Sequence, residues 1–221
     1  MNKKIILFDI DYTLFDTTKF KKILAEEIAE LTNQPLKGFH EILEEVYYKA
    51  RFNNHFEPSL FSRILQERIK RDVINDDLVR VWANKNLIKQ ATYPEAESVL
   101  KKLQSKNYEL GIFSTGNSEF QLAKVSLFED YLHKKHIHIF SNKEEKVAEL
   151  VEQYRDYSLF LVDDFVSILA IAKKTNVNIT TVWIKRGKYA EKAVMPFGFI
   201  PDATIFNLDE LPGIIDIEGA K

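Results

Sequence analysis

The sequence predicts an α/β fold, a doubly wound, Rossmann-like parallel sheet with an inserted all-helical domain. Three observations support this prediction. Short apolar runs end in polar or acidic residues, helical patterns separate these runs, and one long stretch near the N-terminus has helical periodicity without a convincing strand. Strands that alternate with helices are typical of a right-handed, doubly wound sheet.

The expected strands are continuous apolar runs, which indicate parallel strands covered on both faces. The four main runs occupy residues 5–9, 110–114, 159–163 and 180–184. Two further strands are expected at residues 136–140 and 203–206. Helical patterns bounded by Gly, Pro, Asn or Ser lie between them at residues 95–106, 119–128, 144–154 and 166–175.

Residues 17–91 interrupt this alternation. Apolar residues recur there at helical spacing in four segments, at 20–31, 39–46, 60–69 and 78–88. Four helices form a module near the lower size limit for a self-supporting bundle. We therefore predict a core domain of residues 1–16 and 92–221 and a helical cap domain of residues 17–91, joined by short hinges.

Composition excludes several classes of protein. With 31 Lys and Arg against 33 Asp and Glu, the net charge of −2 gives no electrostatic case for nucleic acid or an anionic membrane as a partner. The absence of cysteine excludes disulfides, thiolate metal sites and cysteine nucleophiles. No apolar stretch is long enough for a secretory signal or a membrane span. We expect a cytoplasmic protein, and its oligomeric state stays open.

The first expected strand ends in two carboxylates. Asp9 and Asp11 lie two residues apart, so both side chains point into the crevice at the carboxyl end of the strand. Open α/β sheets bind ligands at that edge. The alternative is a pair of solvated turn residues, but the apolar strand before them favours a functional site.

A second acidic pair, Asp163 and Asp164, closes another apolar run. Carboxylates that pack together raise each other's pKa unless a positive charge lies between them. If the two pairs meet in one crevice, a hard divalent cation with oxygen ligands, Mg²⁺, is the expected cofactor. The alternative is a helix start capped by Asp164.

Two further features suit a phosphate group. Ser114 and Thr115 end a strand and supply hydroxyls, and the loop after them offers backbone amides at the start of a helix. Lys146 opens the helix at residues 144–154, where its ammonium adds to the positive end of the helix. Taken singly, a serine after a strand or a lysine on a helix is more often structural or solvated than functional.

In this order, these residues resemble the motifs of the haloacid dehalogenase-like (HAD) hydrolases. The first motif of that family, DxDx[TV], is present in full from Asp9 to Thr13. Ser114, a lysine and the pair at residues 163–164 match the other three motifs in order and spacing. The resemblance spans nearly the whole chain, and the helical insert resembles the cap of the family's C1 class.

The resemblance implies a Mg²⁺-dependent phosphatase whose partner is a small-molecule phosphate ester, such as a sugar, nucleotide or other metabolite phosphate. Asp9 is then the nucleophile that forms an aspartyl-phosphate, and Asp11 is the general acid and base. The implied phosphate ligands are Ser114, Thr115 and Lys146. The implied metal ligands are Asp9, Asp163, Asp164 and, through its backbone carbonyl, Asp11.

The chain departs from the family pattern at three points. Tyr12 stands where relatives often have Gly, which alters the turn or places a ring at the site entrance. Ile168 and Leu169 stand where many members carry a trailing Asp, so both acids of the second pair are needed for the metal. Lys143 also precedes the helix of Lys146, and we favour Lys146 because the family's lysine usually sits at or just inside that helix.

Other interpretations stay open. Dehalogenating relatives lack the acid at the position of Asp11, so its presence favours phosphoryl transfer. A phosphomutase or phosphotransferase uses the same scaffold, and a non-catalytic phosphate-binding regulatory module keeps the fold without turnover. Residues 47–56 are either a substrate-binding loop or, slightly favoured, a seam between cap helices. His136 and His138 lack a nearby carboxylate in the sequence, so we expect solvated or core-edge histidines rather than a metal site.

Overall fold

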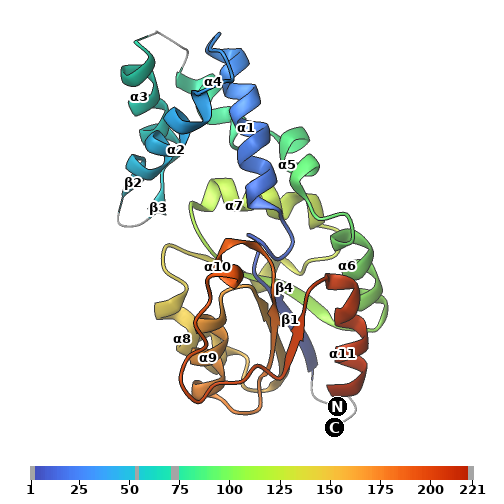
Figure 1. Ribbon diagram of the computed structural model, residues 1–221. Helices are drawn as coiled ribbons and strands as arrows, with labels where there is room; N and C mark the ends of the chain where they lie inside the picture. The colour runs from blue at the N-terminus through green and yellow to red at the C-terminus, as the bar shows by residue number, and fades with distance from the viewer. Residues whose placement is uncertain (1–2, 53–54, 71–74, 219–221) are drawn as a thin grey trace. The chain divides into compact units, whose positions relative to one another are not determined.

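Figure 1 shows the computed structural model of the chain, which describes residues 3–52, 55–70 and 75–218. The chain folds into two compact units. The core unit comprises Met1–Asp16, Thr92–Thr115 and Phe128–Lys221, and the helical unit comprises Thr17–Ala91 and Gly116–Leu127. The chain therefore leaves the core unit soon after the first strand and returns to it at Thr92.

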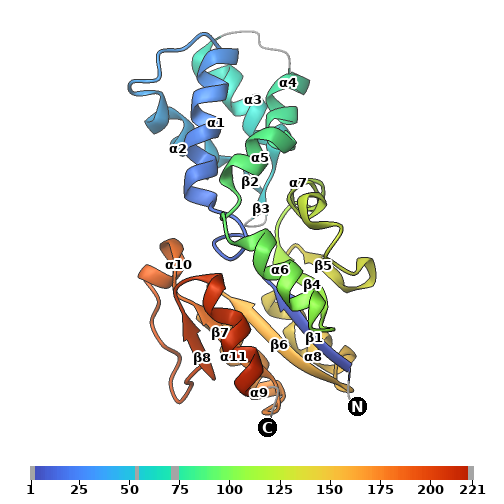
Figure 2. The same cartoon turned by 90° about the vertical axis from the view of Figure 1, so that its right-hand side faces the viewer.

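A six-stranded sheet forms the centre of the core unit (Figure 2). Its order is β5-β4-β1-β6-β7-β8, and every neighbouring pair is parallel. The strands are β1 (Lys3–Phe8), β4 (Glu109–Thr115), β5 (Ile137–Phe140), β6 (Tyr157–Asp163), β7 (Thr180–Ile184) and β8 (Ala203–Ile205). In a parallel sheet all carboxyl ends reach the same edge, which is where open α/β folds bind ligands.

Helices cover both faces of this sheet. In Figure 1, α6 (Ala96–Ser105) and α11 (Leu211–Glu218) lie on one side, and α8 (Val147–Gln153) and α9 (Val166–Thr175) lie on the other. The short helix α10 (Gly187–Glu191) follows β7. Short 3₁₀ turns lie at Ser126–Phe128, Lys134–His136, Glu144–Lys146 and Leu208–Glu210. The predicted doubly wound α/β fold is confirmed.

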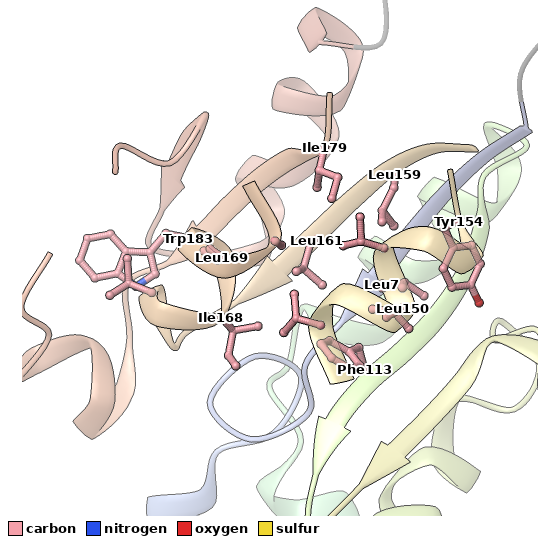
Figure 3. Packing of buried hydrophobic residues seen from close by; sticks show 14 of the residues in the cluster. Leu7, Phe113, Leu150, Tyr154, Leu159, Leu161, Ile168, Leu169, Ile179 and Trp183 are labelled. Atoms are coloured by element: carbon pink, nitrogen blue, oxygen red, sulfur yellow. The ribbon is translucent and has the colours of Figure 1, made fainter. Parts of the chain in front are cut away.

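A large apolar cluster lies between the sheet and helices α8 and α9 (Figure 3). Each fully buried Leu, Ile or Phe side chain contributes roughly 1.5–3 kcal/mol to folding. This packing holds the central strands in register, with Phe8 of β1 beside Ile112 on one side and Val162 on the other. The labelled members of the cluster are Leu7, Phe113, Leu150, Tyr154, Leu159, Leu161, Ile168, Leu169, Ile179 and Trp183.

The helical unit differs from its prediction in two details. The expected fourth helix at residues 78–88 is two helices, because the side chain of Asn84 accepts a hydrogen bond from the N–H of Asn86 at 3.0 Å and starts a new helix. A short antiparallel hairpin, β2 (Arg51–Phe52) and β3 (His55–Phe56), was not expected. The helices are α1 (Thr17–Leu31), α2 (Phe39–Lys49), α3 (Pro58–Ile69), α4 (Asn75–Val81), α5 (Lys85–Ala91) and α7 (Ser118–Val125).

Among the described helices, none has the length and apolarity that crossing a membrane requires.

One segment lies outside its predicted domain. Residues 116–127, which the sequence assigns to the core, group with the helical unit. Phe120 of α7 stacks on Phe20 at a centroid distance of 5.7 Å, and it packs nearly perpendicular to the Trp82 ring at a centroid distance of 5.6 Å. Aromatic side chains bury large apolar areas, so these contacts hold α7 within the helical unit.

Candidate active site

Three neighbouring strands of the core unit deliver polar side chains to one edge of the sheet. Asp9 directly follows β1, Ser114 lies near the end of β4, and Asp163 ends β6. β1 lies between the other two strands, and the backbone N–H of Asp9 donates to the carbonyl of Val162 at 2.9 Å. The strand register therefore places Asp9 beside Asp163.

Lys143 bridges these two carboxylates. Its Nζ lies 2.6 Å from Asp9 Oδ1 and 2.7 Å from Asp163 Oδ2. All three side chains are buried, Asp163 completely. The backbone N–H of Phe165 donates to Asp163 Oδ1 at 2.9 Å. Both carboxylate oxygens of Asp163 are thus engaged by the protein itself.

Asp164 completes a group of three acids. One carboxylate oxygen from each of Asp9, Asp163 and Asp164 lies within 4.8 Å of the others. Asp164 is 3% exposed, and its Oδ2 has no hydrogen-bond partner among the described residues. Its backbone carbonyl accepts a hydrogen bond from Trp183 Nε1 at 3.0 Å, which fixes the chain at this point. A buried carboxylate oxygen without a partner is costly, so it marks a place for a ligand.

Charge in this cluster is unbalanced. Burial raises the pKa of Asp164, and the neighbouring Asp9 and Asp163 raise it further. Burial also raises the pKa of Asp163, although Lys143 opposes this rise. For Lys143, burial lowers the pKa, but the Asp163 and Asp9 carboxylates outweigh burial and raise it above its usual value. One ammonium faces three acids, and a bound cation would supply the missing positive charge.

Asp11 lies in the turn after β1, outside the three-acid group. Its side chain is half-buried. The carbonyl of Ile10 accepts hydrogen bonds from the N–H groups of Thr13 at 3.2 Å and Leu14 at 2.9 Å, which closes a tight turn. Tyr12 in this turn has a φ of 60°, a left-handed conformation that glycine adopts more readily. Tyr12, which stands where relatives often have Gly, is thus held by the turn in an unfavourable backbone conformation. Its ring is buried.

Ser114 and Thr115 have different surroundings. Ser114 Oγ is buried and lacks a hydrogen-bond partner within the described part of the chain. Thr115 Oγ1 accepts a hydrogen bond from the backbone N–H of Lys143 at 3.1 Å. Ser114 is therefore available to a ligand, whereas Thr115 holds the loop that carries Lys143.

The structure brings Lys143, and not Lys146, to the carboxylates. Lys146 Nζ lies 2.6 Å from Glu149 Oε2, and its side chain is 43% exposed. The preference for Lys146 is therefore corrected. Lys143 follows the last residue of β5, Phe140, in the next loop. Lys143 lies closer to this strand end than Lys146 does, so position at a strand end, the feature that points to Asp9, also points to Lys143.

His136 and His138 belong to a separate polar cluster of the core unit. The hydroxyl of Tyr154 lies 2.7 Å from His136 Nδ1 and 2.7 Å from His138 Nε2. The expectation that no carboxylate lies near these histidines is wrong, because Glu109 Oε2 lies 2.5 Å from His136 Nε2. Glu109 and Tyr154 are far from the histidines in the sequence, so no local pattern indicated this cluster.

In the helical unit, Tyr47 and Phe56 pack around Trp82. The ring centroids of Tyr47 and Phe56 are 4.6 Å apart, and those of Phe56 and Trp82 are 4.2 Å apart. These contacts support a seam between helices as the role of the two residues. Residues 53 and 54, which belong to the same expected segment, lie outside the described residues.

The family of the chain follows from a match over most of its length. The family model described as haloacid dehalogenase-like hydrolase matches residues 3–156. The chain belongs to the haloacid dehalogenase-like hydrolases. The resemblance predicted from the four motifs is thereby confirmed, as is the prediction that this HAD protein is a hydrolase.

Similar proteins match nearly the whole length of this HAD chain. A glyceraldehyde 3-phosphate phosphatase from Pyrococcus furiosus is 27% identical, over 99% of this chain and 95% of that protein. The crystal structure of a haloacid dehalogenase-like hydrolase from Burkholderia xenovorans LB400 has a TM-score of 0.75 at 22% identity, over 99% of both chains. The HAD hydrolase YfnB from Bacillus subtilis, in a magnesium-bound crystal structure, has a TM-score of 0.63 at 17% identity, over 98% of this chain and 100% of that chain. The two structures show that the fold is shared.

Proposed function

We propose that this HAD hydrolase is a Mg²⁺-dependent phosphatase that hydrolyses a small phosphomonoester through an aspartyl-phosphate. The observation that carries the proposal is the buried group of Asp9, Asp163 and Asp164, with Asp11 two residues beyond Asp9. Phosphoryl transfer by this route requires a nucleophilic carboxylate, an acid for the leaving group and a cation site in one place. The phosphatase name of the Pyrococcus furiosus relative supports the same reaction.

The three-acid group suits magnesium, which prefers oxygen ligands and is commonly held by one or two carboxylates. Asp164 Oδ2 has no partner among the residues described, whereas both oxygens of Asp163 are engaged by Lys143 and Phe165. We therefore assign Asp9 and Asp164 as the carboxylate ligands and give Asp163 the task of orienting Lys143. When bound, the ion supplies positive charge that lets an anionic ester approach Asp9.

Asp9 and Asp11 divide the chemistry between them. A carboxylate oxygen of Asp9 attacks phosphorus, and the ester P–O bond breaks as Asp11 gives its proton to the departing alkoxide. Asp11, now a carboxylate, takes a proton from a water molecule whose oxygen attacks the same phosphorus. The P–O bond to Asp9 then breaks and orthophosphate leaves, so both acids return to their starting states. The backbone carbonyl of Asp11 stays a predicted further metal ligand.

Ser114 and Lys143 are our proposed phosphate ligands. Ser114 offers a buried hydroxyl without a protein partner in the described chain, and the Lys143 ammonium lies beside the proposed nucleophile. Such donors stabilise the charge that spreads over the phosphoryl oxygens in the transition state. Lys143 takes the role that the sequence assigned to Lys146, and Thr115 acts indirectly by holding the Lys143 backbone.

The substrate we propose to test first is a three-carbon phosphate ester. The relative from Pyrococcus furiosus is named for glyceraldehyde 3-phosphate, and its similarity extends over nearly the whole chain. We propose that the helical unit, residues 17–91 together with 116–127, is the cap domain of this HAD protein.

The decisive assay measures phosphate released with Mg²⁺ from glyceraldehyde 3-phosphate, a panel of phosphorylated metabolites and p-nitrophenyl phosphate. Phosphate released should equal the ester consumed, and a shortfall would indicate transfer to another acceptor. Asp9→Asn should abolish turnover, and Asp11→Asn should lower it at least about 10²-fold. Asp156→Asn, an exposed acid just before β6, is the matched control and should keep the wild-type rate. Wild-type rates in Asp9→Asn would refute the proposal.

Metal binding can be tested without turnover. Mg²⁺ at about 100 times its Kd should raise the free energy of unfolding by about 2.7 kcal/mol. Asp164→Asn should remove most of this stabilisation, whereas Asp156→Asn should keep it. An unchanged response to Mg²⁺ in Asp164→Asn, measured by thermal unfolding, would contradict the assignment of Asp164 as a ligand.

A further inference from the structure

Arg186, just after β7, connects three segments of the core unit. Its Nε donates to the carbonyl of Tyr12 at 3.2 Å, and its Nη2 donates to the carbonyl of Thr13 at 2.5 Å. Its Nη1 donates to Glu95 Oε1 at 2.6 Å. The guanidinium carbon lies 3.6 Å from the centroid of the Tyr93 ring. The side chain is 14% exposed, so these contacts form in a largely buried setting.

A planar guanidinium suits this arrangement. Its N–H groups point in fixed directions, so one side chain donates to two carbonyls and a carboxylate while its face stacks on an aromatic ring. A lysine ammonium is a point charge without this fork. The position therefore depends on the shape of arginine as well as on its charge.

The two carbonyls belong to the turn that carries Asp11. Tyr12 holds a φ of 60° there, which is unfavourable for a residue other than glycine and persists only when the surroundings hold it. The Tyr12 ring lies where a side chain at Gly187 would collide with it, since a Cβ at Gly187 would lie 2.3 Å from Tyr12 Cδ1. The ring also makes an edge contact with Tyr189 at 6.0 Å. Arg186 and the start of α10, where Gly187 and Tyr189 lie, thus pack against one turn.

We propose that Arg186 is a positioning residue that fixes the Tyr12–Thr13 backbone and, through it, the carboxyl group of Asp11. This inference rests on the proposed function, in which Asp11 protonates the leaving group. Tyr12 and Thr13 follow Asp11 directly along the chain. Hydrogen bonds that fix their carbonyl groups therefore restrict the backbone from which the Asp11 side chain extends. Glu95 in turn holds the guanidinium. Without Arg186, the nucleophile Asp9 stays on its strand end while the turn that carries the acid loses the two hydrogen bonds to its carbonyls.

The test compares two esters of similar shape, phenyl phosphate and p-nitrophenyl phosphate. Phenolate is the poorer leaving group and depends more on proton donation. In Arg186→Lys and Arg186→Gln, kcat/KM for phenyl phosphate should fall about tenfold more than kcat/KM for p-nitrophenyl phosphate. Asp11→Asn should show the same selectivity. Arg155→Gln, which removes a surface arginine paired with Glu152, is the control and should leave both values unchanged.

A different result is expected if Arg186 only stabilises the fold. Its replacement would then lower both kcat/KM values by the same factor, equal to the loss of folded protein, and that result would overturn the proposal. If Arg186→Gln does not fold, Arg186→Lys and Glu95→Gln carry the same comparison.

Hydrogen exchange separates this proposal from the proposed function. The amides of Thr13, Leu14 and Phe15 donate to the Ile10 carbonyl, and their exchange should become about tenfold faster in Arg186→Lys. Unchanged exchange would overturn the positioning role whatever the reaction is. Faster exchange in a protein that releases phosphate from neither ester would instead refute the phosphatase proposal and leave Arg186 as the residue that holds this turn.

Discussion

The core unit holds two polar clusters, one buried and one partly buried, that differ in how completely their hydrogen bonds are satisfied. In the histidine cluster, the hydroxyl of Tyr154 pairs with both His136 and His138. The acid cluster consists of Asp9, Asp163, Asp164 and Lys143. Within the described chain, Asp164 Oδ2 has no hydrogen-bond partner, and neither has Ser114 Oγ near the end of the neighbouring strand β4. Native structures pair nearly all of their buried polar atoms. Incomplete pairing therefore separates the acid cluster from the histidine cluster.

One arrangement of protons satisfies every contact of the histidine cluster. We assign His138 Nε2 as a donor to the Tyr154 oxygen, the Tyr154 hydroxyl as a donor to His136 Nδ1, and His136 Nε2 as a donor to Glu109. Burial lowers the pKa of both histidines, which favours the neutral rings that this chain of donors requires. No such closed arrangement exists for three acids around one ammonium.

Removing Lys143 should have the largest effect, because it leaves the acid cluster without its positive charge. We expect Lys143→Met to lower the free energy of unfolding by about 3 kcal/mol, as when one partner of a buried ion pair is lost. Phosphatase activity should fall at least about 10²-fold. Lys146→Met is the matched control, and the loss of its surface pair with Glu149 should change stability by less than about 0.5 kcal/mol. Equal effects of the two variants in urea denaturation and activity assays would return Lys146 to consideration.

Tyr154→Phe should have the next largest effect, and on stability alone. It removes the hydroxyl that both imidazoles share, leaving buried nitrogens unpaired at a cost of roughly 1–3 kcal/mol. Phosphatase activity per folded molecule should stay at the wild-type level. Tyr157→Phe is the control, because the hydroxyl of Tyr157 makes no hydrogen bond to the residues described. A loss of activity in Tyr154→Phe beyond the loss of folded protein would mean that the two clusters are coupled.

The sequence predicted the parts of the site that lie at strand ends. Continuous apolar runs identified the strands, and the parallel sheet then required Asp9 and Asp163 to meet at one edge. The sequence favours Lys146 over Lys143, because the approach of Lys143 to the carboxylates depends on the path of the loop after β5 rather than on a periodic pattern. Arg186 gave no signal at all, since its partners Tyr12 and Thr13 are distant in the sequence and are contacted through backbone carbonyls.

The helical unit illustrates the same limit for the fold. Apolar periodicity predicted helices, but a single residue, Asn84, divided the expected segment at 78–88 by capping a new helix. The position of α7 was also not predictable, because its place in the helical unit depends on contacts of Phe120 with Phe20 and Trp82 across the sequence. Local patterns identify elements, whereas long-range side-chain contacts decide which elements belong together.

The smallest expected effect is on pH dependence, where the two clusters should act with opposite signs. Burial lowers the pKa of His136 and His138 below the usual value of about 6.5. As pH falls below about 6.5, the unfolded chain therefore binds more protons than the folded chain. On acidification the histidine cluster thus lowers the free energy of unfolding. Asp163 and Asp164 have raised pKa values, so the folded chain binds more protons at their titration and this cluster makes the same quantity increase on acidification.

Variants separate the two contributions. On acidification from pH 7.5 to pH 5.5, His138→Gln should shift the change in the free energy of unfolding toward a gain, by at most about 1.4 kcal/mol for each pH unit because only one proton is involved. Asp164→Asn should shift the same change toward a loss, because it removes a group that acts in the opposite direction. His40→Gln, an exposed histidine of the helical unit, should keep the wild-type slope. Urea denaturation at each pH measures these slopes without added metal. If His138→Gln and Asp164→Asn shifted the slope in the same direction, the opposite signs assigned to the histidine cluster and the acid cluster would be wrong.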